Sequence, residues 1–256
     1  NRLGIRITSE LVNFDRDLGT TGWRFDSNQE LSFSMNKAGM FLTPAIALRQ
    51  TNYWLNDAIS DGQDSISRTL PIASLDAGLT LERSTNKLGD WIQTLEPRVL
   101  YVRIPYKNQS LLPVFDTIEP DFNLVQLFRK YQFLGPDRVA DADKISFGIT
   151  TRLIDQKSGQ EKLTATLGQT RYRSTEGAVP PDSLPSISNE SDYIAEISVN
   201  IYKAWNLGID YQWNSYTNAA VRKEARFQYR PSERRLFSFG YRYRRDLLEQ
   251  GDMSLV

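Results

Sequence analysis

Apolar and polar residues alternate with a period of two along much of the chain, most regularly over residues 205–214. The apolar positions in that segment are Trp205, Leu207, Ile209, Tyr211 and Trp213. A second regular segment places Phe237, Phe239 and Tyr241 between polar or small residues. Because successive side chains of a β-strand point to opposite faces, both segments are predicted to be strands with one apolar and one polar face.

This alternation, with the turn signals between segments, predicts about eleven antiparallel strands. Their expected ranges are 3–15, 21–36, 40–55, 69–84, 91–106, 144–155, 161–174, 192–203, 205–217, 220–230 and 235–246. A turn at 202–204 places Val199 opposite Leu207 and Ile201 opposite Trp205. The connections at 56–68, 107–143 and 175–191 are expected to be long. Long and short connections mostly alternate along the chain, as in outer-membrane barrels.

Two features favour a membrane barrel over a soluble β-sandwich, which also alternates. Several segments reach 10 or more residues, whereas soluble strands usually have about 5–6. Trp205 and Trp213 lie on one apolar face, and at about 3.3 Å per residue and a tilt of about 40° they span roughly 20 Å along the membrane normal. That span is close to the roughly 25 Å apolar band of such barrels. The sandwich remains an alternative, and it predicts a monodisperse protein without detergent.

The expected fold class is therefore all-β, a transmembrane antiparallel β-barrel. A barrel must close, because lipid offers no partner to an unpaired backbone N–H or C=O. Single-chain bacterial barrels have an even number of strands, so the odd count predicts that residues 1–256 are an internal part of a larger barrel. No apolar run approaches the roughly 20 residues of a transmembrane helix, and the mean hydropathy is −0.47.

Three prolines fall inside predicted strands, at Pro44, Pro71 and Pro97. Each removes one donor from the hydrogen-bond ladder. Pro97 lies between the strand-like residues Leu95 and Val99, so it is expected to mark a bulge or a local break in pairing.

The alternation assigns strand residues to two faces. The predicted lipid-facing residues are Trp205, Leu207, Ile209, Tyr211, Trp213, Phe237, Phe239 and Tyr241. The predicted lumen-facing residues are Glu96, Arg98, Arg152, Glu196, Asp210, Gln212, Glu224, Arg226, Arg242 and Arg244. Neighbouring carboxylates and guanidinium groups are expected to balance charge on a wet lumen wall. The alternative for the cationic rows, such as Arg242 and Arg244, is contact with phosphate groups.

Composition narrows the function classes. The chain has no His and no Cys, which removes Ser-His-Asp catalysis, His metal sites and thiol chemistry. A phospholipase or protease needs a nucleophile with a general base, so we predict no enzyme, no metal site and no cofactor. Lys+Arg and Asp+Glu both number 31, and this balance does not indicate a nucleic-acid partner.

Residues 107–143 are the least strand-like part of the chain. Pro113, Pro120 and Pro136 exclude one continuous strand or helix there. Within the segment, apolar residues follow helical spacing at Leu124, Leu127, Phe128 and Tyr131. The sequence predicts a long extracellular loop with a short helix. The loop either packs on the rim of the barrel or folds into the lumen and contacts a plug.

Several segments together resemble the barrel of the LptD family of lipopolysaccharide-assembly proteins. They are residues 9–16 (SELVNFDR), 39–55 (GMFLTPAIALRQTNYWL), 67–83 (SRTLPIASLDAGLTLER), 94–106 (TLEPRVLYVRIPY), 135–155 (GPDRVADADKISFGITTRLID) and 166–172 (TLGQTRY). The segments occur in the order that the family shows and cover nearly the whole chain, so residues 1–256 resemble part of the LptD barrel domain.

The resemblance implies a barrel of about 26 strands, in the outer membrane of a Gram-negative bacterium. It implies an LptE-like lipoprotein plug in the lumen and lipopolysaccharide as the transported ligand. The family's lateral gate and disulfides lie in parts that this chain does not contain. The alternative function is a passive porin-like or structural barrel, which would show a wide conductance in the intact complex.

Overall fold

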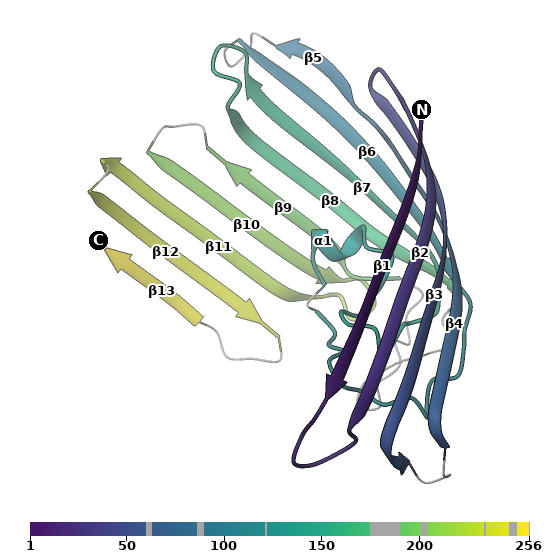
Figure 1. Cartoon of the computed structure of the whole chain (residues 1–256). Helices are drawn as coiled ribbons and strands as arrows, with labels where there is room; N and C mark the ends of the chain where they lie inside the picture. The colour runs from purple at the N-terminus through teal and green to yellow at the C-terminus, as the bar shows by residue number, and fades with distance from the viewer. Residues whose placement is uncertain are drawn as a thin grey trace.

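The computed structural model of the chain describes residues 1–59, 63–85, 90–120, 122–174, 190–200, 204–232, 234–245 and 250–255. These residues form one antiparallel sheet of 13 strands that curves around a concave inner side (Figure 1). The strands are β1 Arg2–Phe14, β2 Gly22–Lys37, β3 Met40–Ile59, β4 Gln63–Leu79, β5 Leu81–Thr85, β6 Trp91–Ile104, β7 Ala142–Asp155, β8 Glu161–Ser174, β9 Tyr193–Val199, β10 Trp205–Asn214, β11 Ala219–Ser232, β12 Arg235–Arg244 and β13 Gln250–Leu255.

Neighbours in the sheet follow the order of the chain, except that β5 pairs with β6 beyond the end of β4. Among the described strands, β1 and β13 are the two edges, so the sheet is open (Figure 1). The pairing of Val199 with Leu207 is the one that the sequence predicts. The predicted pairing of Ile201 with Trp205, and the turn beside it, lie outside the described residues.

The β6–β7 connection, residues 105–141, lies within the curve of the sheet (Figure 1). It contains the short helix α1, Leu124–Leu127, which begins where the Asn123 side chain accepts a hydrogen bond from the Gln126 backbone N–H. No helix in the described ranges is long and apolar enough to cross a membrane.

The prediction of one strand over 69–84 is wrong, because the strand is interrupted at Thr80. The pairs Gly78–Arg98 and Leu81–Leu95 keep the same register on both sides of the interruption. Continuing that register places Pro97 beside the gap, where it has no N–H to donate. On the other edge, the Thr80 backbone N–H donates to the Gly39 carbonyl at 2.7 Å, which continues the β3–β4 register. Pro97 therefore marks the local break in pairing that the sequence predicts.

The prediction of a long connection at 56–68 is also wrong, since β3 continues to Ile59 and β4 begins at Gln63. The sequence there is polar and does not indicate a strand, but its backbone continues the β3–β4 ladder. Thr51 pairs with Arg68 and Trp54 pairs with Ser65. Backbone pairing holds these strand ends together without apolar alternation. In contrast, β10 ends before the predicted residue 217, because the Asn214 side chain accepts from the Thr217 backbone N–H at 2.7 Å and closes a turn.

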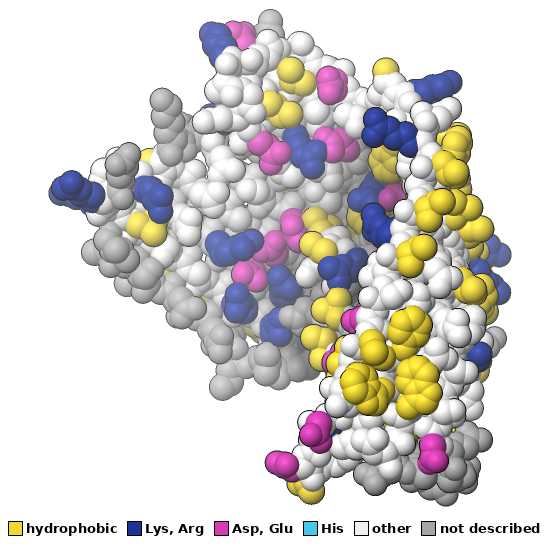
Figure 2. Space-filling model, in the orientation of Figure 1, with side chains coloured by type: hydrophobic (Ala, Val, Ile, Leu, Met, Phe, Trp, Pro, Cys, Tyr) yellow, Lys and Arg dark blue, Asp and Glu magenta, His cyan; other side chains and the backbone are white. Residues whose placement is uncertain are grey.

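The outer face of the sheet carries large apolar side chains that are exposed. They include Ile5, Ile7, Leu31, Ile46, Leu48, Leu75, Val99, Ile149, Leu167, Ile197, Trp205, Ile209, Tyr211 and Phe239. Charged side chains gather within the curve, whereas hydrophobic side chains lie over the outer side of β1 and β2 (Figure 2). The sheet thus separates two chemistries by strand alternation alone.

Part of the inner face is apolar as well, and the β6–β7 connection covers it. Leu100, Val102 and Ile104 of β6 are buried on the inner side, next to Leu70 and Ile72 of β4. Phe128 and Tyr131 of the connection pack against this cluster, together with Val139. Residues 99–102 are therefore apolar on both faces, and the inward Leu100, Val102 and Ile104 hold the connection in place by burial of apolar surface.

Two paired glycines make room for α1 on the inner face. Gly148 of β7 is opposite Gly168 of β8. A Cβ atom on Gly148 would lie 2.9 Å from Phe128 Cζ, and one on Gly168 would overlap Leu127 Cδ2. Leu127 is fully buried, so it has little space to move away. The helix approaches the sheet this closely because neither glycine has a side chain.

Replacement of Gly168 by Ala is expected to displace α1 and to lower the free energy of unfolding by about 1–3 kcal/mol, the usual effect of overpacking. Urea unfolding of the barrel in lipid vesicles, followed by tryptophan fluorescence, measures this change. The matched control is Gly208→Ala in β10, where the nearest atoms to a Cβ belong to the Arg226 side chain at 3.5 Å or more. Equal effects of the two substitutions would contradict the close approach.

Candidate functional site

A buried arginine on the inner face binds the β6–β7 connection. The Arg24 side chain of β2 is 1% exposed and donates to both carboxylate oxygens of Asp116, at 2.7 and 2.8 Å. It also donates to Asp137 Oδ1 at 2.7 Å and to Glu10 Oε1 of β1 at 2.8 Å. One guanidinium therefore joins two strands to two distant points of the connection, with the directional geometry of a bidentate pair.

Asp137 is the second centre of this cluster and is fully buried. Its Oδ1 accepts from the Tyr53 hydroxyl at 3.0 Å as well as from Arg24. Its Oδ2 accepts from the backbone N–H groups of Phe115 and Asp116, at 2.7 and 2.9 Å. Both carboxylate oxygens are thus occupied, as a buried charge requires.

Arg68 of β4 holds the same segment from the opposite side. Its side chain donates to Gln109 Oε1 at 2.5 Å, to Thr51 Oγ1 at 2.9 Å and to the Asp137 carbonyl at 2.9 Å. Gln109 in turn accepts from the Val139 N–H and donates to the Val139 carbonyl. We call Arg24, Tyr53, Arg68, Asp116 and Asp137 the clamp.

Aromatic rings extend the contact between the sheet and the connection. Phe14 and Phe115 stack with ring centroids 4.1 Å apart, and the Arg24 guanidinium lies 4.8 Å from the Phe14 centroid. Towards α1, Arg98 lies 4.4 Å from the Phe128 centroid. Such contacts between cations and aromatic rings help to orient the rings, in addition to the apolar surface that the rings bury.

The Arg24 guanidinium holds the pKa of the Asp116 carboxyl below its usual range, mainly through the hydrogen bonds between them. A carboxyl whose pKa is lowered on folding contributes its full stabilisation above the ordinary Asp pKa of about 3.9. That contribution is lost only as the pH falls through the lowered value. The ion pair between Arg24 and Asp116 is therefore fully formed at neutral pH.

A row of polar residues crosses the inner face in register from β6 to β12. Its members are Glu96, Thr150, Thr166, Glu196, Asp210, Glu224 and Arg242. Arg226 pairs with Asp210 at 3.0 Å and Arg242 pairs with Glu224 at 3.2 Å. The Arg226 and Arg242 side chains are 60% and 56% exposed, so water screens these pairs.

The register places the sequence-predicted residues of each class on a common face. Arg152 forms an ion pair with Glu96, and Arg98 pairs with Asp76 at 2.7 Å. Gln212 and Arg244 are both aligned with Arg222 of β11. On the other face, Trp205 packs edge-on against Phe227 and Tyr229, with centroids 5.2 Å apart in each case. Contact of these faces with lumen and lipid stays a prediction.

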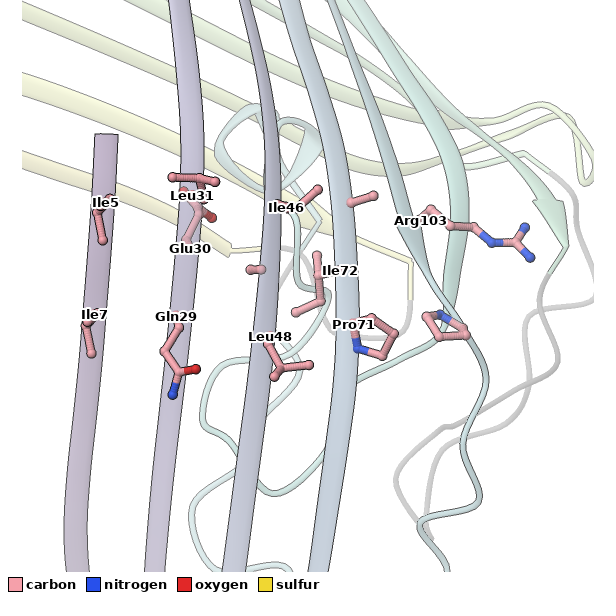
Figure 3. A pocket seen from close by; sticks show the side chains of 13 residues that line it. Ile5, Ile7, Gln29, Glu30, Leu31, Ile46, Leu48, Pro71, Ile72 and Arg103 are labelled. Atoms are coloured by element: carbon pink, nitrogen blue, oxygen red, sulfur yellow. The ribbon is translucent and has the colours of Figure 1, made fainter. Parts of the chain in front are cut away.

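The outer face is hollowed across β1–β4, with a volume of about 880 Å³ (Figure 3). Ile5 and Ile7 of β1 and Leu48 of β3 lie along this hollow, and Pro71 of β4 lies beside them. Arg103 is at its margin and forms an ion pair with Asp143. The lining of the hollow is mostly apolar.

Sequence reasoning missed the clamp, and only one signal could have indicated it. Residues 99–102 are apolar at consecutive positions, which predicts a strand buried on both sides. That signal indicates that something covers the inner face there. It does not indicate that Arg24 and Asp137, which are 113 positions apart, meet at 2.7 Å.

A curved antiparallel sheet with an apolar, exposed outer face and a charge-paired inner face is the wall of a transmembrane β-barrel. The family model of LptD, described as LPS transport system D, matches residues 1–255. The chain belongs to the LptD family, whose members are outer-membrane β-barrels.

Three similar proteins each carry the name LPS-assembly protein LptD. The protein of Nitrosococcus oceani is 36% identical over 255 residues, covering 98% of this chain and 35% of its own length. That of Aromatoleum aromaticum is 36% identical and covers 91% of this chain and 30% of its own length. That of Thiobacillus denitrificans is 35% identical and covers 99% and 35%. The chain thus spans about a third of the length of the curated relatives it matches.

Replacement of Arg24 by Gln is expected to lower the free energy of unfolding by about 3–5 kcal/mol, because it removes the ion-pair partner of the buried Asp137 carboxylate. Limited proteolysis should then cut the β6–β7 connection, which we expect to resist cleavage in the unaltered protein. The control is Arg226→Gln, which removes an exposed pair expected to contribute about 0–1 kcal/mol. If the connection stays resistant in Arg24→Gln, the clamp does not hold it.

Proposed function

We propose that the chain forms part of a translocation barrel that assembles lipopolysaccharide into the outer leaflet of the outer membrane of a Gram-negative bacterium. The observation that carries the proposal is the two-faced sheet, in a chain of the LptD family whose relatives are named for LPS assembly. The predicted lipid-facing and lumen-facing residues belong to the two sides of this wall.

The physical logic follows from the chemistry of an amphiphile. Lipopolysaccharide has sugars that must stay hydrated and acyl chains that must stay in an apolar medium. The paired charges on the inner face offer a wet path for sugars, and the apolar outer face is compatible with hydrocarbon. A wall of this kind keeps both halves solvated during transfer. The hollow across β1–β4 provides apolar surface for acyl chains of the surrounding lipid (Figure 3).

An LptE-like lipoprotein in the lumen is part of the same proposal. The β6–β7 connection occupies the inner face next to β2–β4 and α1 reaches β8 and β9, whereas Arg226 and Arg242 on β11 and β12 remain exposed. The exposed part is available to a plug protein. We place the β6–β7 connection on the extracellular side, because the long connections of outer-membrane barrels lie there.

The assignment of lipid and lumen predicts unequal effects for two arginine substitutions at nearly the same depth. Ile209→Arg on the outer face should lower the free energy of unfolding in vesicles by about 2–4 kcal/mol near the bilayer midplane. Ser198→Arg, on the inner face opposite Gly208, should change it by less than about 1 kcal/mol. Urea titration of the barrel in vesicles measures both. Equal effects would contradict the assignment.

The function itself is tested by depleting the full-length protein in cells and measuring lipopolysaccharide at the cell surface. A translocation barrel predicts that surface lipopolysaccharide falls while newly made lipopolysaccharide accumulates in the inner membrane. Single-channel recording of the intact complex gives the second readout. A plugged translocation barrel predicts little conductance until its partner is removed. Unchanged surface lipopolysaccharide together with wide conductance would instead establish the passive porin.

A further inference from the structure

Lys144 of β7 is a buried cation on the inner face that has no counter-ion among the described residues. Its residue is 6% exposed, and it makes no ion pair or hydrogen bond with the described residues. It is aligned with Tyr172 of β8 and lies two positions from the buried Ser146. Every other buried charged residue named above has an oppositely charged or hydrogen-bonded partner, so Lys144 stands apart.

The Lys144 side chain lines a hollow of about 270 Å³ between the β6–β7 connection and strands β8–β10. The connection contributes Glu119, Gln126 and Gln132, and the strand side contributes Tyr172, Gln212 and Asn214, among others. The lining is rich in amide and hydroxyl groups, which donate to and accept from sugar hydroxyls. Both the cation and these groups line the same hollow.

Each carboxylate around this hollow already accepts a hydrogen bond from another side chain, and Glu119 and Asp192 accept theirs from neutral amides. Glu119 accepts from Gln132 Nε2 at 2.8 Å. Asp192 accepts from Gln212 Nε2 at 2.6 Å and from Asn214 Nδ2 at 2.7 Å. The third acid, Glu190, pairs with Arg171 at 3.3 Å. The lysine is therefore the lining charge that still lacks a partner among the described residues.

Burial of an ammonium group without a partner is unfavourable, and an oxyanion that entered the hollow would offset that cost. We propose that the hollow binds an oxyanion carried by a sugar, a phosphate ester or a carboxylate, with Lys144 Nζ as the charged donor. This inference rests on the proposed function, in which the saccharide part of lipopolysaccharide passes along the inner face. It assigns one place on that path to the acidic groups of the saccharide.

Ligand-observed NMR on the full-length protein with its partner, in detergent, tests this site with glucosamine 1-phosphate and glucuronate. Lys144→Met should weaken binding of both by about tenfold or more, the effect of losing one charged hydrogen bond. Lys144→Arg should retain binding. Lys157→Met, at an 84% exposed side chain, is the control and should bind as the unaltered protein does. Because Lys144→Met removes an unpaired buried charge, it should also raise the melting temperature.

The remaining arms separate the sources of the anion and the two levels of inference. Glucosamine without phosphate should bind at least about tenfold more weakly; equal binding would overturn the role of the anion. Equal binding of inorganic phosphate and glucosamine 1-phosphate would identify a free-phosphate site and overturn the saccharide part. Normal binding by Lys144→Met would overturn the site itself. Surface lipopolysaccharide after depletion reports on the proposed function separately, so either inference can fail alone.

Discussion

Backbone pairing is the constraint on which the rest of this structure depends. In hydrocarbon, a backbone N–H or C=O has no solvent partner, so each must be paired within the protein. The antiparallel ladders satisfy this need from β1 to β13 in chain order. The exception shows how strict the constraint is. Where Pro97 offers no N–H, β4 ends and β5 begins, while the Thr80 N–H still pairs with the Gly39 carbonyl of the neighbouring strand side.

Once the ladders fix the backbone, alternation sorts the side chains, but the two faces are not equally simple. The outer face carries exposed large apolar side chains from β1 to β12. The inner face has two parts. Next to β2–β4 and β6, it is covered by the β6–β7 connection and contains apolar and charged side chains that are fully buried. Along β10–β12 it is open, and its ion pairs are hydrated.

The fold was largely predictable because it rests on local periodicity. The alternation of Trp205, Leu207 and Ile209 predicts a strand, its face and its register with β9, and the structure has that register. The ends of β3 and β4 were not predictable in this way, because polar residues such as Asn52 and Ser67 pair through their backbones alone. The side-chain pattern cannot indicate these strand ends, because their ladder is formed by backbone groups.

The clamp was unpredictable for a different reason. Arg24, Arg68 and Asp137 are ordinary charged residues in the sequence, and their meeting depends on how a connection of 105–141 returns across the sheet. The glycine pair of β7 and β8 has the same character. Gly148 and Gly168 gain their significance only when Leu127 and Phe128 pack on them.

Two kinds of contact, apolar burial and ion pairs, hold the connection on the inner face in different ways. Burial of Val139, Phe128 and Tyr131 against the inner face supplies the net attraction, because apolar burial needs no exact geometry. A buried ion pair contributes little net stability, since desolvation offsets the Coulomb attraction. It does restrict position, because a bidentate pair such as that of Arg24 with Asp116 forms in one arrangement only. The apolar cluster therefore holds the connection inside the curve, and the ionic clamp fixes the position of the connection on the inner face. With the connection fixed in this position, its residues Glu119, Gln126 and Gln132 line the hollow around Lys144, on the side of β8–β10.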